Sequence, residues 1–149
     1  MALLKNPSDI CQMIVDKLKA NAVTLGVAAV DVYYGDRDAF TDYPAIAVEI
    51  VDSTVDVMPG YRGKYRFAAY VMVYHGKYSD AEALKKAADI FGERVRDVLN
   101  SDPQWKDVSL NQQLISAWVT RLEPGYARRG SLVYATRITW EALSQAPLN

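Results

Sequence analysis

The chain has 149 residues, half of them apolar and 23% charged, with a formal net charge of −1. This length and composition predict a single soluble domain over residues 1–149 and exclude a disordered or fibrous chain. The small net charge provides no global basic field for nucleic acid, so any electrostatic role must come from local patches.

The first predicted element is a helix that begins at Asn6 and Pro7, a capping residue followed by a favourable first helical residue. Cys11 falls in this helix, and we expect it to be buried and inert. As the only cysteine, it excludes an internal disulfide. Apolar residues recur every three to four positions until about Asn21 and indicate one buried stripe: Ile10, Met13, Ile14 and Leu18.

Three strands are expected next. Residues 28–35 (AAVDVYYG) are rich in branched and aromatic side chains and end at a turn signal. Residues 45–52 (AIAVEIVD) alternate as in a half-buried strand. Residues 64–75 (KYRFAAYVMVYH) are apolar at most positions, which is typical of a strand covered on both faces.

The second half of the chain predicts a helix followed by a hairpin. Ser79 and Glu82 form a capping box, and an apolar stripe continues from there to Asn100. Residues 114–123 (LISAWVTRLE) and 131–143 (SLVYATRITWEAL) predict two antiparallel strands. The order α-β-β-β-α-β-β therefore predicts an α+β fold, in which two helices pack on a mostly antiparallel sheet.

The sequence offers little for catalysis or for a cofactor. His75 is the only histidine, which argues against a catalytic triad or a histidine metal cluster and favours a strand-end residue. Asp36, Asp38 and Asp42 superficially resemble a calcium loop, but its glycine and closing glutamate are missing, so a solvated turn is the better interpretation. We therefore expect no catalytic residue, no bound metal and no cofactor.

Two similar stretches stand out: MPGYRG at residues 58–63 and EPGYARRG at residues 123–130. We expect each to form the tip of a hairpin. The first would then expose Tyr61 and Arg62, and the second Tyr126, Arg128 and Arg129. Tyrosine and arginine at exposed tips suit phosphate contact or docking onto an acidic protein surface. The alternative is a solvated turn, in which glycine and proline only satisfy turn geometry.

The chain contains ten tyrosines, most of them in or beside predicted strands. A sheet face that carries tyrosines is a common subunit-contact surface, although strand propensity explains much of this pattern. No stretch has the ~18 apolar residues of a membrane span, and the N-terminus has no signal-peptide pattern, so we expect assembly in the cytoplasm. Contact-prone strands without catalytic motifs are typical of a building block for a larger assembly.

Four segments and the order of the elements carry a family resemblance: YPAIAVEIVD, YRFAAYVMVYH, SDAEALKKAADIFGERVRDVL and GSLVYATRITWEAL. The pattern resembles the tail terminator, or tail-completion and head-tail joining, proteins of long-tailed bacteriophages. It implies an α+β sandwich and a hexameric ring at the end of a finished tail tube. The ring would stop tube polymerisation and bind the head-tail connector, without catalysis. The implied partners are copies of the chain itself, the tail tube protein and the connector, in a virion assembled in the host cytoplasm.

A closing ring needs two different patches on each subunit. The candidate contacts to ring, tube or lumen are Tyr61 and Arg62 on one side and Tyr126, Arg128 and Arg129 on the other. A cation in the lumen could also guide transiting DNA without reading its sequence. Three alternatives remain: another phage neck or tail-tube component, a small nucleic-acid-binding module, and a small enzyme on a ferredoxin-like scaffold.

Overall fold

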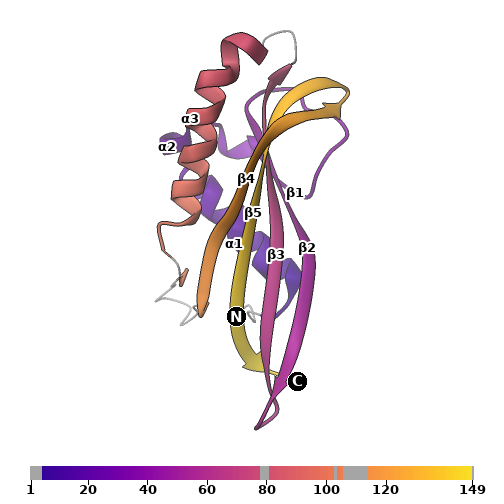
Figure 1. Cartoon of the computed structure of the whole chain (residues 1–149), viewed down its shortest axis with the longest axis vertical. Coiled ribbons are helices and arrows are strands. Elements are labelled where there is room, and N and C mark those ends of the chain that lie inside the picture. The colour runs from indigo at the N-terminus through magenta and orange to yellow at the C-terminus, as the bar shows by residue number, and fades with distance from the viewer. Residues whose placement is uncertain (1–4, 78–80, 103, 106–113, 149) are drawn as a thin grey trace.

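The computed structural model of the chain describes residues 5–77, 81–102, 104–105 and 114–148 (Figure 1). Among these residues, the strands form one five-stranded sheet in the order β1-β2-β3-β5-β4. The predicted α+β fold with a mostly antiparallel sheet is confirmed. The helices are α1 (Pro7–Ala20), α2 (Ala22–Leu25) and α3 (Ala81–Leu99), and the strands are β1 (Val32–Tyr34), β2 (Ala45–Met58), β3 (Arg62–Lys77), β4 (Ser116–Arg129) and β5 (Ser131–Pro147).

Two long hairpins make up most of the sheet. β2 pairs with β3 along the whole of β2, and β4 pairs with β5 along the whole of β4, both antiparallel. β3 also pairs with β5, so that Arg62 lies opposite Pro147 and Lys77 lies opposite Val133. Because the start of β5 lies beside the end of β3, the two hairpin turns lie at opposite ends of the sheet (Figure 1). The short β1 is parallel to β2.

Helices α1 and α3 cover one face of the sheet and form the main core with it. α1 contributes Ile10, Ile14 and Leu18, so the predicted stripe is confirmed, and α3 contributes Val95 and Leu99. Alternate strand residues point toward these helices because successive side chains of a strand face opposite sides. The strand residues of this core include Ile46, Val48, Phe67, Ala69, Val71, Val73, Ile138 and Trp140.

The other face of the sheet is covered at one end only, as far as the described residues show. Near the β4–β5 turn, Phe40 and Tyr43 from the loop at residues 35–44 pack on a small apolar cluster that includes Ala47 and Tyr74. The rings of Phe40 and Tyr74 lie 4.6 Å apart. Toward the β2–β3 turn, most side chains of this face are exposed to solvent, among them Asp52, Thr54 and Arg66.

Some predicted elements differ in extent from the observed ones. The expected strand at 28–35 is reduced to β1, because Ala29–Asp31 form a 3-10 turn and only Val32–Tyr34 pair with β2. The short helix α2 has no counterpart in the prediction. The predicted capping box at Ser79 lies outside the described residues.

The expected second Pro-Gly-Tyr tip is wrong. Pro124, Gly125 and Tyr126 lie inside β4 and pair with β5, and the chain turns instead at Gly130. β4 is an edge strand with β5 as its neighbour in the described sheet, and an edge position accepts proline because its nitrogen can face away from the neighbour. Gly130 has a φ of 78°, a backbone conformation that glycine adopts at little cost.

Candidate assembly interfaces

The β2–β3 hairpin extends beyond the long helices as an arm, which we define as residues 51–66 together with 144–148 (Figure 1). From Val51 onward, β2 is exposed almost throughout, and Val57 has an exposed fraction of 75%. The inner residue Gly63 is tightly enclosed: a Cβ there would lie 2.8 Å from the Tyr65 ring and 2.9 Å from Val55 and Leu148 side-chain atoms. The arm is thus a packed three-stranded projection, with exposed apolar residues.

The arm tip, residues 59–64, combines a tyrosine with two cations. Gly60 and Tyr61 have φ values of 83° and 58°, and the Tyr61 carbonyl accepts a hydrogen bond from the Leu148 N–H at 2.9 Å. A positive φ is uncommon for an aromatic residue. The Tyr61 side chain is 83% exposed. Arg62 is exposed, Lys64 is half-buried, and neither takes part in an ion pair among the described residues.

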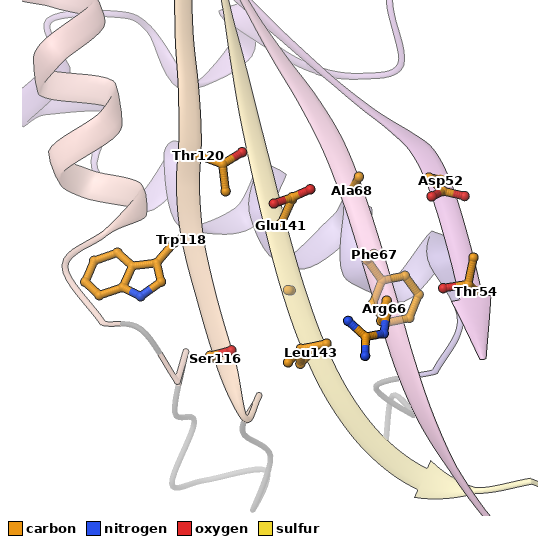
Figure 2. Close-up of a pocket in the computed structure, with 11 residues that line it drawn as sticks. Asp52, Thr54, Arg66, Phe67, Ala68, Ser116, Trp118, Thr120, Glu141 and Leu143 are labelled. Carbon is orange, nitrogen blue, oxygen red and sulfur yellow. The ribbon is translucent and has the colours of Figure 1, made fainter. Parts of the chain in front are cut away.

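A shallow groove of about 360 Å³ lies on the open face of the sheet, where the base of the arm joins the rest of the sheet (Figure 2). Arg66 is the one cation among the described residues that line it, and its charge is already paired, because its Nε lies 3.3 Å from the Asp56 carboxylate. Asp52 and Glu141 are exposed and form no ion pair within the described part of the chain. The groove therefore carries excess negative charge. We call it the acidic groove, and its lining residues are Asp52, Thr54, Arg66, Phe67, Ala68, Ser116, Trp118, Thr120, Glu141, Ala142 and Leu143.

Apolar side chains border the acidic groove. Trp118 projects from the edge strand β4 and is 50% exposed, and Leu143 follows Glu141 on the same face of β5 (Figure 2). Large exposed aromatic residues next to unpaired charges are frequent in protein contacts, where they contribute much of the binding energy. The acidic groove can therefore offer both apolar side chains and carboxylates to a basic partner.

The other hairpin tip is fixed by an ion pair. Arg129 donates hydrogen bonds from Nη2 and Nε to the Asp36 carboxylate at 2.5 and 3.3 Å, and the Tyr74 hydroxyl donates to the same carboxylate at 2.8 Å. The Asp36 and Arg129 side chains are 24% and 25% exposed. We call these three residues the Asp36 cluster. It ties the β4–β5 turn to the loop at residues 35–44.

The electrostatics of the Asp36 cluster follow from its geometry. Burial alone raises the pKa of Asp36, but hydrogen bonds from Arg129, Tyr74 and the backbone N–H of Arg37 outweigh it and hold the pKa below its ordinary value. Burial and the Asp36 carboxylate both raise the pKa of Tyr74. The carboxylate is therefore ionised and the phenol protonated at neutral pH. Asp36 lies in the predicted exposed turn, but its carboxylate is bound by Arg129 and Tyr74.

The five predicted contact residues occupy two separate ends of the molecule. Tyr61 and Arg62 lie at the arm tip. Arg128 is exposed near the other turn, and Tyr126 is 59% exposed, with its ring 5.4 Å from that of Tyr134. Arg129 belongs to the Asp36 cluster, so its charge is neutralised within the chain. The sheet keeps the two sets apart.

The cysteine and the histidine, whose side chains serve most often as nucleophile or base in enzymes, are both buried in this protein. Cys11 is buried, as predicted, and burial raises the pKa of its thiol to about 11, with the charge of Glu49 adding to the effect. His75 is buried, with Nε2 2.7 Å from the Thr136 hydroxyl, and burial lowers its pKa to about 4. At neutral pH the thiol is protonated and the imidazole is neutral, so both act as packing residues.

The acidic groove was missed by sequence reasoning. Its charges come from β2 and β5, which are distant in sequence and brought together by pairing with β3. A usable signal was present, since Asp52, Thr54 and Asp56 put polar side chains on one face of an otherwise apolar strand.

The comparisons with known proteins show the fold. No protein-family profile matches the chain, and no curated protein matches it significantly in sequence. A chain described as part of the "virion of native gene transfer agent (GTA) particle" has a similar structure, with a TM-score of 0.57 and 14% sequence identity. The match covers 92% of this chain and 95% of that chain. The two chains therefore share a fold over nearly their whole lengths.

None of the described helices combines the length and apolar character needed to cross a membrane. Nor do three or more histidine, cysteine or acidic side chains gather as a candidate metal site in the part of the chain that the structure describes.

Proposed function

We propose that the protein is a structural virion protein that forms a ring at the head-proximal end of a phage tail tube. There it stops tube polymerisation and presents the surface to which the head-tail connector binds. The observation that carries the proposal is the shared fold with a chain from a gene transfer agent virion, over 92% and 95% of the two chains. The sequence resemblance to tail terminators gives the more specific position at the tail end and the hexameric ring.

The shape of the subunit supports a head-to-tail ring. Such a ring uses two different patches on each subunit, and the chain has its exposed hairpin ends at opposite ends of one sheet. In this proposal Tyr61 and Arg62 contact one neighbour or the tube, and Tyr126 and Arg128 contact another partner. Arg129 serves this second surface by fixing its shape. The partners are copies of the chain, the tail tube protein and the connector, and assembly takes place in the host cytoplasm.

The proposed role is non-enzymatic. Cys11 and His75 are packed in the core in the thiol and neutral imidazole forms, which supports a structural function. The exposed cations Arg62 and Arg128 could still contact DNA that passes through the lumen, because such contact needs charge and no base recognition. If a lumen contact is present, binding of the assembled ring to DNA falls steeply as salt concentration rises.

Negative-stain imaging of the purified protein, alone and mixed with tail tubes, tests the proposal. Closed rings, or a cap at one end of each tube, are the expected result. Long tubes formed by the protein alone would favour a tail-tube component instead. A protein that leaves both tube ends bare and binds nucleic acid as a single chain, in a gel-shift titration, would favour the nucleic-acid-binding alternative.

A further inference from the structure

The arm tip and the acidic groove carry opposite charges on the same molecule. The tip presents Arg62 and Lys64, and the groove presents Asp52 and Glu141. None of these four residues takes part in an ion pair among the described residues. Unpaired charges of opposite sign, on two surfaces of one protein, are the pattern expected when one copy binds another.

The tip cannot reach the groove of its own chain. Both lie along β3, which is a continuous strand from Arg62 to Lys77. Glu141 pairs with Ala68, six positions beyond Arg62 on that strand, so at about 3.3 Å per residue the two charges lie roughly 20 Å apart. Hydrogen-bonded neighbours on both sides of β3 keep this strand extended from the tip to the groove. The partner of the groove must therefore be another molecule.

The residues of the two surfaces also complement each other. The tip is a narrow turn that carries Tyr61, and the residues that line the groove include Leu143 on β5 and Trp118, whose ring lies at the outer edge of β4 (Figure 2). Tyrosine and arginine are the residues that most often anchor protein contacts, because they combine a large contact area with polar groups. A tip of this composition can place its ring on the apolar side chains of the groove and its cations on the carboxylates.

We propose that the arm tip of one copy docks into the acidic groove of the next copy. Tyr61 packs against Trp118 and Leu143, while Arg62 and Lys64 face Glu141 and Asp52. The contact joins unlike surfaces, so its repetition generates a closed ring or a filament. It rests on the proposed function, because it names the contact that joins neighbouring copies. The β4–β5 end then stays available for the tube or the connector.

Other occupants of this region fit less well. Nucleic acid is disfavoured because its phosphates would face the unpaired carboxylates of Asp52 and Glu141. Two copies could instead pair through the outer edge of β2, which in the described sheet has β1 beside it only at Ile46–Val48. Antiparallel pairing centred on Thr54 would place Asp52 opposite Asp56 of the other copy, and like charges directly opposite are destabilising.

Charge reversal at each surface tests the contact. The Arg62→Glu variant and the Glu141→Arg variant change exposed side chains, so both should fold, as circular dichroism can verify. Each variant alone should associate with itself about 10- to 100-fold more weakly than the unmodified protein, measured by sedimentation over a concentration series. The matched control is Arg94→Glu, which reverses an exposed arginine on α3, away from both surfaces, and should leave self-association unchanged.

Mixing the two variants gives the decisive result. In an alternating ring, the acidic tip of the Arg62→Glu variant would meet the basic groove of the Glu141→Arg variant, and each unmodified tip would meet an unmodified groove. An equimolar mixture should therefore restore association, in rings with an even number of subunits. The contact is overturned if the single variants associate like the unmodified protein, or if they are weakened and the mixture is not restored. An unmodified protein that stays a single chain at every concentration would overturn the proposed ring itself, which separates the two failures.

Discussion

The two hairpins contain the same Pro-Gly-Tyr letters and use them differently. In the β2–β3 hairpin these residues form the turn, and Arg62 begins the next strand. In the β4–β5 hairpin they lie within an edge strand, and the turn falls at Gly130. Within the described part of the chain, Arg62 and Lys64 at the first tip form no ion pair, whereas Arg129 near the second turn is bound to Asp36. One end is thus equipped to bind, and the other is held rigid by the chain itself.

Acid should lower the free energy of unfolding through His75. This residue lies near the β4–β5 end of the sheet, next to Gly76, which pairs with Tyr134 of β5. Burial, opposed by the charge of Asp89, lowers the folded-state pKa of His75 from 6.5 to about 4. The unfolded chain therefore binds the proton first, and stability falls as pH falls from 6.5 to about 4, by at most about 3 kcal/mol. The free energy of unfolding, measured by urea titration over this range, should show a smaller slope for His75→Gln. An unchanged slope would contradict this assignment.

Removing the ion pair of the Asp36 cluster should lower stability, whereas removing a cation from the arm tip should not. Arg129→Ala leaves the partly buried Asp36 carboxylate without its main partner, so the free energy of unfolding should fall by about 2 kcal/mol at neutral pH. Arg62→Ala and the control Arg128→Ala should stay within about 0.5 kcal/mol of the unmodified protein.

The pH dependence of the Arg129→Ala deficit provides an internal check. The folded-state pKa of Asp36 is depressed, so its contribution is fully present above the unfolded-state value and is lost as pH falls through the folded-state value. The difference in free energy of unfolding between Arg129→Ala and the unmodified protein should therefore become smaller below about pH 4. A deficit that stays constant down to about pH 2 would show that lost packing, and not the ion pair, causes it.

Three glycine substitutions distinguish a turn from a strand. Gly60 and Gly130 have φ values of 83° and 78°, so alanine at either position should lower the free energy of unfolding by about 1 kcal/mol. Gly125 lies within β4, and a Cβ there would meet nothing within 4 Å, so Gly125→Ala should be neutral or slightly stabilising. Thermal unfolding of the three variants measures the difference. A costly Gly125→Ala would indicate that the second Pro-Gly-Tyr stretch forms a turn after all.

The smallest effect concerns Tyr61, whose φ of 58° is unfavourable for a tyrosine. Tyr61→Gly should raise the free energy of unfolding by about 0.5 kcal/mol, because glycine accepts this backbone conformation. The same variant should weaken self-association if the side chain anchors the docked tip. Greater stability together with unchanged association would mean that Tyr61 makes no contact between copies.

Local patterns were sufficient to predict most of the fold. The spacing of Ile10, Ile14 and Leu18 predicts α1, and the alternation around Ile46 and Val48 predicts β2, because each pattern reflects a single buried face. The start of β1 could not be predicted in this way, since the length of this strand depends on its register with β2. Proline posed the same difficulty at position 124, where a turn and an edge strand are both compatible with the local sequence.

The candidate surfaces were harder to predict because they depend on distant residues. Asp36 and Arg129 are 93 positions apart in sequence, and nothing local indicates that one neutralises the other. Glu141 and Asp52 enter one groove only because β5 and β2 flank β3. By contrast, the exposure of Tyr61 and Arg62 followed from the turn itself, so the arm tip is the part of the candidate site that sequence reasoning located.

The molar mass of the purified protein in solution, measured by light scattering over a concentration series, tests the central claim most directly. A ring-forming subunit with a binding tip at one end predicts one defined multiple of the chain mass, six in the proposed ring, which decreases when Arg62 is replaced by glutamate. The mass of a single chain at every concentration, with no change in that variant, would contradict the account.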